Sequence, residues 1–249
     1  MPAPAHAFAR SLFPEIEGRH ELDELLLSVS GATIEEINIA PGLAALDGVT
    51  TRASRSELTR QTSLDAFARS IADEQRQTLL KTFLQHPASA AHAKSLADQA
   101  VHDLASSIHQ LSVRTLVASM HYLRDRSELT GRTSSERFQC FCTLSSTPEF
   151  AESLARGFPV HATQVRQAAQ QAHLNIAEFL IRLEETFRSA PLAALVAPQS
   201  VLTRLQMTSG DPHARGRRVL IAHFDSGTKL VYKPRPMAEV TYAEIRELS

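Results

Sequence analysis

The sequence predicts a mainly α-helical protein in which a helical scaffold is followed by a C-terminal β-hairpin. Apolar residues recur at steps of three and four over most of residues 63–189, which is the period of an amphipathic helix. Only residues 210–236 show the alternation of β-strands, around a turn at residues 225–228. A chain of 249 residues, of which 43% are hydrophobic, can bury a sizeable core as one large domain or two small ones.

Composition and charge exclude several classes of protein. A formal net charge of −1 and a pI near 6.8 give no general attraction to nucleic acid or to an anionic membrane. No apolar run is long enough to span a membrane, and residues 1–20 lack the continuous apolar segment of a signal peptide. The two cysteines, Cys140 and Cys142, are too few for a disulfide scaffold. We therefore predict a cytoplasmic protein.

No group of residues has the sequence spacing of a metal site. Cys140 and Cys142 could form half of one, but no second pair completes it, so both are expected to be small apolar residues on a helix. His102, His109 and His121 share one predicted helix, but no two of them are four residues apart, as the histidines of a helical zinc motif are. We therefore predict no metal ligands in this sequence.

Residues 1–60 are the least regular part of the chain. A short helix is expected at residues 21–29. Residues 42–55 are expected to form a loop because Pro, Gly, Thr and Ser are frequent in this region. The helical scaffold is expected to follow at residues 61–200.

The scaffold begins with two predicted helical regions. Residues 63–85 form one helix or a broken pair, which ends at His86 because the residue before Pro87 disfavours helical backbone. Residues 91–124 form a longer helix, in which apolar residues recur at steps of three and four with one skip.

A capping box opens the next predicted helix. Thr133 and Glu136 have the spacing at which each side chain accepts a hydrogen bond from the other residue's backbone N–H. Phe138, Phe141 and Leu144 are expected to face inward from this helix.

Two more helices complete the scaffold. Thr147 and Pro148 start the first of them, and Gly157 lies just past its predicted end. The most regular helix is predicted over residues 163–189, and Pro191 follows it. Its inward stripe consists of Val165, Ala169, Ala172, Ile176, Leu180, Leu183 and Phe187.

Residues 201–249 contain the predicted hairpin. Apolar residues alternate over residues 219–224, turn residues follow at 225–228, and an apolar, β-branched and aromatic run resumes at 230–232. A two-stranded hairpin alone is marginally stable in water, so further strands are expected beside it.

The second strand of the hairpin should end at Lys233. Pro234 follows it and has no N–H to donate to a sheet. Because side chains alternate along a strand, Val231 and Lys233 should share one face, and Tyr232 should point to the other.

Basic residues concentrate around this hairpin. Between Arg204 and Arg235, seven Arg and Lys residues face two Asp residues, a local excess of five positive charges. The loop before the hairpin offers backbone N–H groups, and Gly216 allows a ligand to approach closely. A lysine at a strand end is a compact point charge that can reach a phosphate. The pattern is typical of a polyphosphate site, and also of a basic surface hairpin.

The order of motifs in this region resembles one family. Residues 210–213 read Gly-Asp-Pro-His, a basic spacer, a strand and a turn with Gly follow, and residues 229–235 read Lys-Leu-Val-Tyr-Lys-Pro-Arg. The match continues upstream through Arg-Thr-Leu at residues 114–116 and Glu-Arg-Phe at residues 136–138. The chain therefore resembles the dehydratase domain of class II lanthipeptide synthetases, the LanM family.

The resemblance covers residues 100–249 and, more weakly, residues 60–100. It implies a core that is similar to a lipid kinase and is wrapped by extra helices, so that the hairpin would start the N-lobe of that core. It also implies ATP and Mg²⁺ as cofactors and a ribosomal precursor peptide as partner. Members of the family phosphorylate Ser and Thr of that peptide and then eliminate the phosphate, which leaves dehydroalanine and dehydrobutyrine in lantibiotic biosynthesis.

Five residues carry the expected site. Lys233 matches the family lysine that is expected to contact the ATP phosphates, and Arg217 and Arg235 are further candidates for phosphate contacts. Asp211 and His213 match the loop residues implicated in catalysis, chiefly in the elimination step. An imidazole with an ordinary pKa of about 6.5 can exchange protons near neutral pH. The structural alternatives are a turn cap for Asp211, a solvated loop residue for His213 and an exposed strand end for Lys233.

The chain departs from the family at several points. Pro212 and Ala214 replace the common Thr and Asn, so the loop conformation is expected to differ. The sequence stops at Ser249, before the expected Mg²⁺ ligands, the other catalytic residues and the cyclase domain. We therefore expect an N-terminal dehydratase fragment that is inactive in isolation. Two alternatives are a catalytically dead helical protein that binds a peptide, and a kinase with an unrelated substrate.

Overall fold

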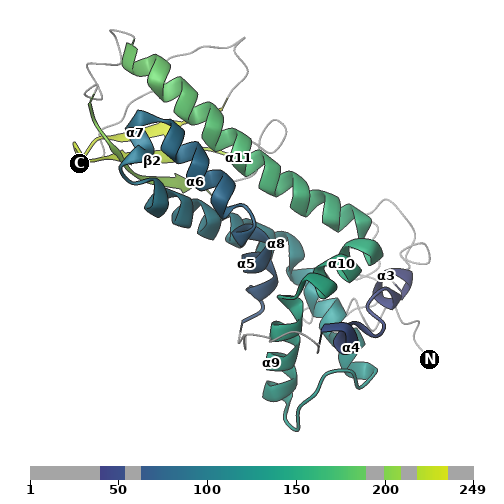
Figure 1. Cartoon of the computed structure of the whole chain (residues 1–249). Coiled ribbons are helices and arrows are strands. Elements are labelled where there is room, and N and C mark those ends of the chain that lie inside the picture. Colours follow the sequence, from purple (N-terminus) through teal and green to yellow (C-terminus); the bar gives the residue numbers. More distant parts are fainter. Residues whose placement is uncertain (1–39, 54–62, 189–198, 209–217, 235–249) are drawn as a thin grey trace, which may run out of the picture. The chain divides into compact units, whose positions relative to one another are not determined.

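The computed structural model describes residues 40–53, 63–188, 199–208 and 218–234. Helices make up most of this part of the chain, and three antiparallel strands form a small sheet (Figure 1). The predicted mainly helical fold with β-structure near the C-terminus is therefore confirmed. The short helix predicted at residues 21–29 lies outside the described residues.

The chain divides into two compact units. One comprises residues 1–67 and 111–162, and the other comprises residues 68–110 and 163–249. The described helices are α3 (Ala40–Ala44), α4 (Val49–Ala53), α5 (Ala66–Asp73), α6 (Arg76–Gln85), α7 (Pro87–Ala90), α8 (Ala93–Asp125), α9 (Ser134–Ser145), α10 (Pro148–Gly157) and α11 (Pro159–Arg188). The described strands are β1 (Leu202–Met207), β2 (Leu220–Phe224) and β3 (Lys229–Tyr232). Within these ranges, every helix is too short or too polar to span a lipid bilayer.

Helices α3 and α4 occupy most of residues 42–55, where the composition predicts a loop, so that prediction is wrong. Leu43, Leu46 and Val49 are buried, and both helices pack against α10. Gly48 adopts a φ of 67° in the turn between them, a conformation that glycine allows at little cost. The apolar spacing of three residues therefore outweighs the loop-like composition.

The first unit contains an aromatic cluster around Phe150, which is fully buried. The ring centroid of Phe150 lies 5.6 Å from that of Phe141 and 6.3 Å from that of Phe67, both in edge-to-face geometry. His161 lies beside Phe67, with the ring centroids 6.2 Å apart, and its Nε2 is 2.9 Å from Ser112 Oγ. Burial lowers the pKa of His161, so it is a neutral core histidine.

Helix α9 begins at the predicted capping box. Thr133 Oγ1 accepts a hydrogen bond from Glu136 N at 3.1 Å, and Glu136 Oε2 accepts one from Thr133 N at 3.1 Å. Phe141 and Leu144 are buried as predicted, but Phe138 is 36% exposed, so its predicted inward position is wrong. No residue of the first two turns of α9 is buried, because core contact begins at Phe141.

The helices of the second unit follow the predicted pattern. The region 63–85 is a broken pair, α5 and α6, and Pro87 ends α6 and begins α7. Helix α8 lies within two residues of its predicted ends, and α11 starts at Pro159 rather than at residue 163, because proline is well suited to a first helical position. The stripe residues of α11 that are buried are Val165, Ala169, Ile176, Leu180 and Leu183.

The sheet contains the predicted hairpin and one strand more. Strands β2 and β3 pair antiparallel around a turn in which Gly227 has a φ of 82°. Strand β1 pairs with the other edge of β2, so the sheet order is β1-β2-β3. The alternation pattern misses β1 because a bulge between Leu202 and Arg204 places the buried Leu202 and Leu205 three residues apart, as in a helix.

Candidate functional site

The sheet has an inner face that packs on helices. Buried residues from β1 and β2 line it, and β3 contributes the half-buried Tyr232, whose ring centroid is 5.5 Å from that of Phe179 on α11. Phe224 similarly contacts Phe187 of α11, with centroids 6.4 Å apart. The fully or nearly fully buried members are Leu202, Leu205, Leu220, Ala222 and Phe224. These contacts fix the sheet on the C-terminal half of α11.

The opposite side of the sheet, here called the outer face, carries polar and basic residues. Cross-strand pairing places on it Arg204, Gln206, Ile221, His223, Lys229 and Val231, and the alternation of β3 adds Lys233. Val231 is 46% exposed and Lys233 is exposed, whereas Tyr232 faces inward. The predicted split of Val231 and Lys233 from Tyr232 is therefore confirmed.

Lys233 lies at one end of the outer face, directly after β3. At the same end, Leu220 pairs with both Tyr232 and Met207, and Thr208 N donates to Val219 O at 3.0 Å. Thr208 and Arg218, the described residues on either side of positions 209–217, therefore lie at the Lys233 end of the sheet.

Four of the five predicted site residues lie outside the described residues: Asp211, His213, Arg217 and Arg235. Lys233 is the fifth, and its side chain reaches solvent. The sheet topology brings Lys233, Thr208 and Arg218 to one end of the sheet, and the roles assigned to all five residues stay predictions.

Three helix residues that sequence reasoning missed bond to described residues on either side of positions 209–217. Asp103 Oδ2 accepts from Met207 N at 2.9 Å, and Arg218 donates from its guanidinium to Ser107 Oγ at 2.8 Å. Asn175 Nδ2 donates to the Arg218 carbonyl oxygen at 2.8 Å. Asp103 and Ser107 are one helical turn apart on α8, so they lie on the same face of that helix.

The environment of Asp103 changes its acidity. Burial raises the pKa of this carboxyl, and the Met207 N–H and the neighbouring positive charges of His102, Arg204 and Arg218 oppose that rise. Folding therefore disfavours the ionised form of the Asp103 carboxyl relative to its protonated form.

A row of basic groups crosses the other end of the outer face. Arg204, His223 and Lys229 are aligned on successive strands, and His223 Nε2 is 3.3 Å from Gln206 Oε1. Burial lowers the pKa of His223, and the charges of Lys229 and Arg204 lower it further. At neutral pH the row therefore carries its charge on Arg204 and Lys229.

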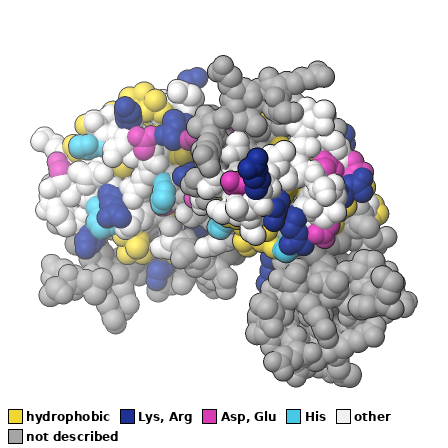
Figure 2. Space-filling view, turned by 90° about the horizontal axis from the view of Figure 1, so that it is seen from below, with side chains coloured by type: hydrophobic (Ala, Val, Ile, Leu, Met, Phe, Trp, Pro, Cys, Tyr) yellow, Lys and Arg dark blue, Asp and Glu magenta, His cyan; other side chains and the backbone are white. Residues whose placement is uncertain are grey.

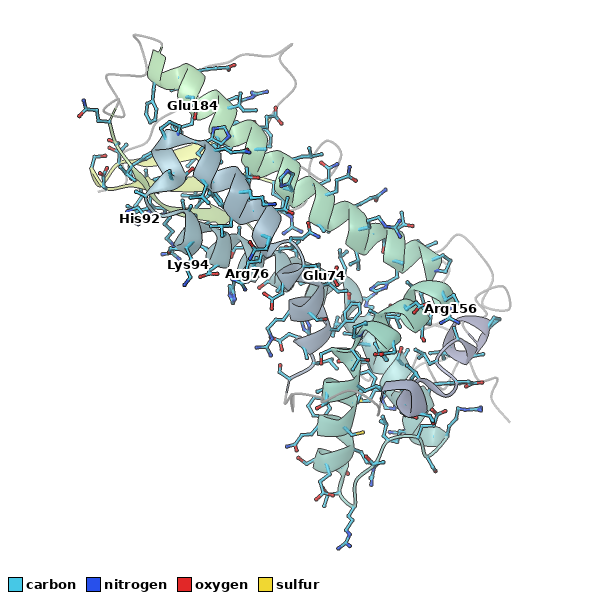
Figure 3. The ribbon with its side chains drawn as sticks, viewed as in Figure 1. Glu74, Arg76, His92, Lys94, Arg156 and Glu184 are labelled. Atoms are coloured by element: carbon cyan, nitrogen blue, oxygen red, sulfur yellow. The ribbon has the colours of Figure 1, made fainter. Side chains whose placement is uncertain are left out.

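Charge is mixed on the face of the molecule that Figure 2 shows. Figure 2 shows Lys and Arg side chains interspersed with Asp and Glu on the face in view. Glu184 of α11, labelled in Figure 3, lies beside His86, and its Oε1 is 2.8 Å from His86 Nδ1. This contact links α11 to the junction of α6 and α7, which is a structural role.

Among the described residues, no three His, Cys, Asp or Glu side chains are grouped so that they could hold a metal ion. Both cysteines are free thiols. Cys142 is fully buried, and burial, with a smaller effect from the charge of Asp65, raises the pKa of its thiol to about 11. Cys140 is half-buried, and its Sγ lies 3.4 Å from Thr130 Oγ1.

We expect a thiol reagent at pH 8 to modify Cys140 and to leave Cys142 unmodified. A thiol with a pKa about three units above the pH is ionised in about one molecule in a thousand, and only the thiolate reacts. The measurement is the reaction of the native chain with an aromatic disulfide, with Cys140→Ala and Cys142→Ala as the two controls. Equal reaction rates for the two single variants would contradict the buried position of Cys142.

One protein family matches part of the chain. Its description is "domain of unknown function (DUF4135)", and it matches residues 158–247. The match covers α11 and all three strands, but not Asp103 and Ser107 of α8. This domain is associated with lanthipeptide synthetase-like proteins. No curated protein is similar enough to the chain to count as a match.

Proposed function

We propose that this chain supplies the ATP-phosphate-binding sheet of a lanthipeptide dehydratase, in which that sheet starts a lipid-kinase-like N-lobe. Such an enzyme phosphorylates Ser and Thr of a ribosomal precursor peptide and then eliminates the phosphate. The observation that carries the proposal is the position of Lys233. It is exposed on the outer face of the sheet, at the end where Thr208 and Arg218 lie, inside the region that matches DUF4135.

Lys233, the one candidate site residue that the structure describes, suits a phosphate group. Lys233 directly follows strand β3, which is held by its pairing with β2 and by the contact of Tyr232 with Phe179. The backbone from which the Lys233 side chain extends therefore has a defined position. The adjoining segment contains Gly210 and Gly216, which allow backbone N–H groups to approach an anion closely. A triphosphate placed at this end of the sheet would meet the positive charge of Lys233.

ATP supplies the phosphoryl group, and the residues of this chain bind and orient it. Lys233 would offset the negative charge of the phosphates, with Arg217 and Arg235 as further contacts. Mg²⁺ accompanies ATP in such reactions, but the described residues form no acidic group to bind it, so we assign it no ligand here.

The chemistry needs two steps because a hydroxyl is a poor leaving group. In the first step the Ser or Thr oxygen bonds to the γ-phosphorus, the bond from that phosphorus to ADP breaks with its electron pair left on ADP, and the hydroxyl proton is released. In the second step a base removes the Cα proton, its electron pair forms the double bond to Cβ, and the Cβ–O bond breaks to release phosphate. We assign the proton transfers of this step to His213, with Asp211 as its partner in the same segment.

The test is to purify the protein from its own cells and incubate it with a Ser/Thr-containing precursor peptide, ATP and Mg²⁺. Mass spectrometry should detect a phosphorylated peptide first and a peptide lighter by one water afterwards. A phosphopeptide that persists would indicate a kinase of another kind. Peptide binding without ATP consumption would indicate a non-enzymatic interaction protein, and both results would contradict the proposal.

A further inference from the structure

Three basic residues lie side by side on the outer face of the sheet, at the end opposite Lys233. Arg204, His223 and Lys229 are partners across the three strands, and Arg204 and Lys229 are exposed. These three residues are here called the basic row. Like charges that lie directly opposite one another destabilise a sheet. The basic row is therefore an arrangement that a bound negative charge would stabilise.

The strand register brings the side chains of the basic row close together. Phe224 N donates to Thr228 O at 3.0 Å, so these two residues form a hydrogen-bonded pair. Because such pairs alternate along an antiparallel ladder, His223 and Lys229 form a non-hydrogen-bonded pair, whose Cα atoms are about 4.5 Å apart. Arg204 is the partner of His223 on its other side. A single anion placed over His223 would therefore meet both neighbouring cations.

Within the described residues, no carboxylate forms an ion pair with the basic row. Asp225, the acidic residue closest in sequence to His223, accepts from Val201 N at 2.9 Å through its Oδ1. The charge of Asp103 interacts with that of Arg204, but Asp103 Oδ2 accepts from a backbone N–H of β1. Both carboxylates are thus engaged by backbone, and the positive charge of the row remains available to a ligand.

The groups of the basic row suit a phosphate monoester. Arg204 offers a planar fork of N–H donors, and Lys229 offers a compact ammonium group. His223 Nε2 is 3.3 Å from Gln206 Oε1, which is an acceptor, so Nδ1 is the ring nitrogen available to an anion. A phosphate monoester carries a charge of about −1.5 to −2 and three terminal oxygens, which match two cations and an imidazole. A carboxylate has one charge and two oxygens.

The strand that carries Lys229 also has an edge on which a peptide can pair. In the described part of the chain, β2 is the only strand that pairs with β3. By the alternation given above, the backbone N–H and C=O groups of Lys229 and Val231 point away from β2. The other edge of the sheet is different, because the N–H groups of Leu205 and Met207 donate to side chains of α8. An added strand therefore fits β3 and not β1.

We propose that an extended peptide adds to the edge of β3 and places a phosphorylated Ser or Thr side chain on the basic row. Val231 lies two residues along β3 on the same face and is 46% exposed, so it would contact an apolar side chain two positions from the phosphorylated one. This site is separate from the phosphates assigned to Lys233 and goes beyond the proposed function. Under that function its ligand is the phosphorylated intermediate, but binding to the site needs no catalysis.

Calorimetric titration of the 249-residue chain tests the basic row. The probe is a short peptide of alternating Val and Thr with one central phosphoserine, and its unphosphorylated twin should bind about tenfold more weakly or worse. Arg204→Gln and Lys229→Gln should each weaken binding of the phosphopeptide about fivefold or more. Lys81→Gln is the matched control, because it removes an exposed charge from α6 and not from the sheet, and it should change the affinity by less than about twofold. Equal affinities for the two peptides, or equal losses in Lys229→Gln and Lys81→Gln, would overturn the proposal.

NMR spectroscopy of the same complex tests the strand pairing. The phosphopeptide should slow hydrogen exchange at the amides of Lys229 and Val231 about tenfold or more, and should raise the pKa of His223, because a dianion favours the imidazolium form. Unchanged exchange at both amides, or inorganic phosphate that binds as tightly as the phosphopeptide, would overturn the proposal.

Competition with ATP separates this site from the one at Lys233. Saturating ATP with Mg²⁺ should leave the affinity for the phosphopeptide within about threefold, and complete displacement by ATP would overturn the proposal. A chain that binds the phosphopeptide at the basic row but binds no ATP would contradict the proposed function and support this inference.

Discussion

Replacement of Lys233 by alanine is expected to lower the affinity of the chain for ATP by about tenfold or more, since hydrogen bonds to charged groups contribute about 1.5–3 kcal/mol. The side chain is exposed at the end of β3 and contributes nothing to the inner face, so the fold should be unaffected. The measurement is calorimetric titration of the 249-residue chain with ATP and Mg²⁺ at one fixed salt concentration.

Lys229→Ala is the matched control for this prediction. Lys229 and Lys233 are both exposed and point to the same face of one strand, at opposite ends of the sheet, so each variant removes the same charge. We expect Lys229→Ala to change the affinity by less than about threefold, because a long-range charge effect is screened by salt. Equal losses for the two variants would show a general effect of charge and would contradict a phosphate contact at Lys233.

Replacement of Phe150 by alanine is expected to destabilise the first unit by about 3–5 kcal/mol, the usual cost of removing a buried aromatic ring. Phe150 is fully buried between Phe141 and Phe67, and its loss removes two edge-to-face contacts and leaves a cavity. Urea unfolding followed by circular dichroism measures the change in the free energy of unfolding.

Phe138→Ala provides the comparison for Phe150. The two residues have the same side chain and lie on consecutive helices, α9 and α10. Phe138, however, is 36% exposed and lies about one turn before the part of α9 that reaches the core. We expect its replacement to cost less than about 1 kcal/mol, as is usual for surface positions. A cost for Phe138→Ala that equals that of Phe150→Ala would mean that the aromatic cluster is placed wrongly.

Local signals in the sequence were sufficient for most of the helices. The capping box at Thr133 and Glu136, the proline at position 148 and the stripe of α11 are interactions within one or two turns of helix, which sequence spacing specifies directly. The hairpin of β2 and β3 is equally local, because its turn and its alternation lie in one short stretch.

Features that depend on distant contacts could not be predicted in this way. Strand β1 is identified by its pairing with β2, and its bulge removes the alternation that would have indicated a strand. Helices α3 and α4 have loop-like composition and are stabilised by packing on α10, about a hundred residues away in the sequence. Phe138 has the spacing of a core residue but lies before the part of α9 that reaches the core.

The candidate site also combines a residue that local sequence predicts with contacts between distant residues. Lys233 was identified from its motif and its strand position, both local. The bonds of Asp103 to Met207 and of Ser107 to Arg218 join residues 104 and 111 positions apart, so no spacing in the sequence could indicate them. These bonds depend on the packing of the sheet against α8.

The most direct test of the phosphate-binding claim is to titrate the chain with adenosine, AMP, ADP and ATP in turn, each with Mg²⁺. Lys233 and the glycine-containing segment would contact phosphate oxygens, so affinity should rise with each added phosphate and should be weakest for adenosine. The rise from AMP to ATP should be reduced in Lys233→Ala and preserved in Lys229→Ala. Equal affinity for adenosine and ATP, or no binding of any of the four, would contradict a phosphate site at this end of the sheet.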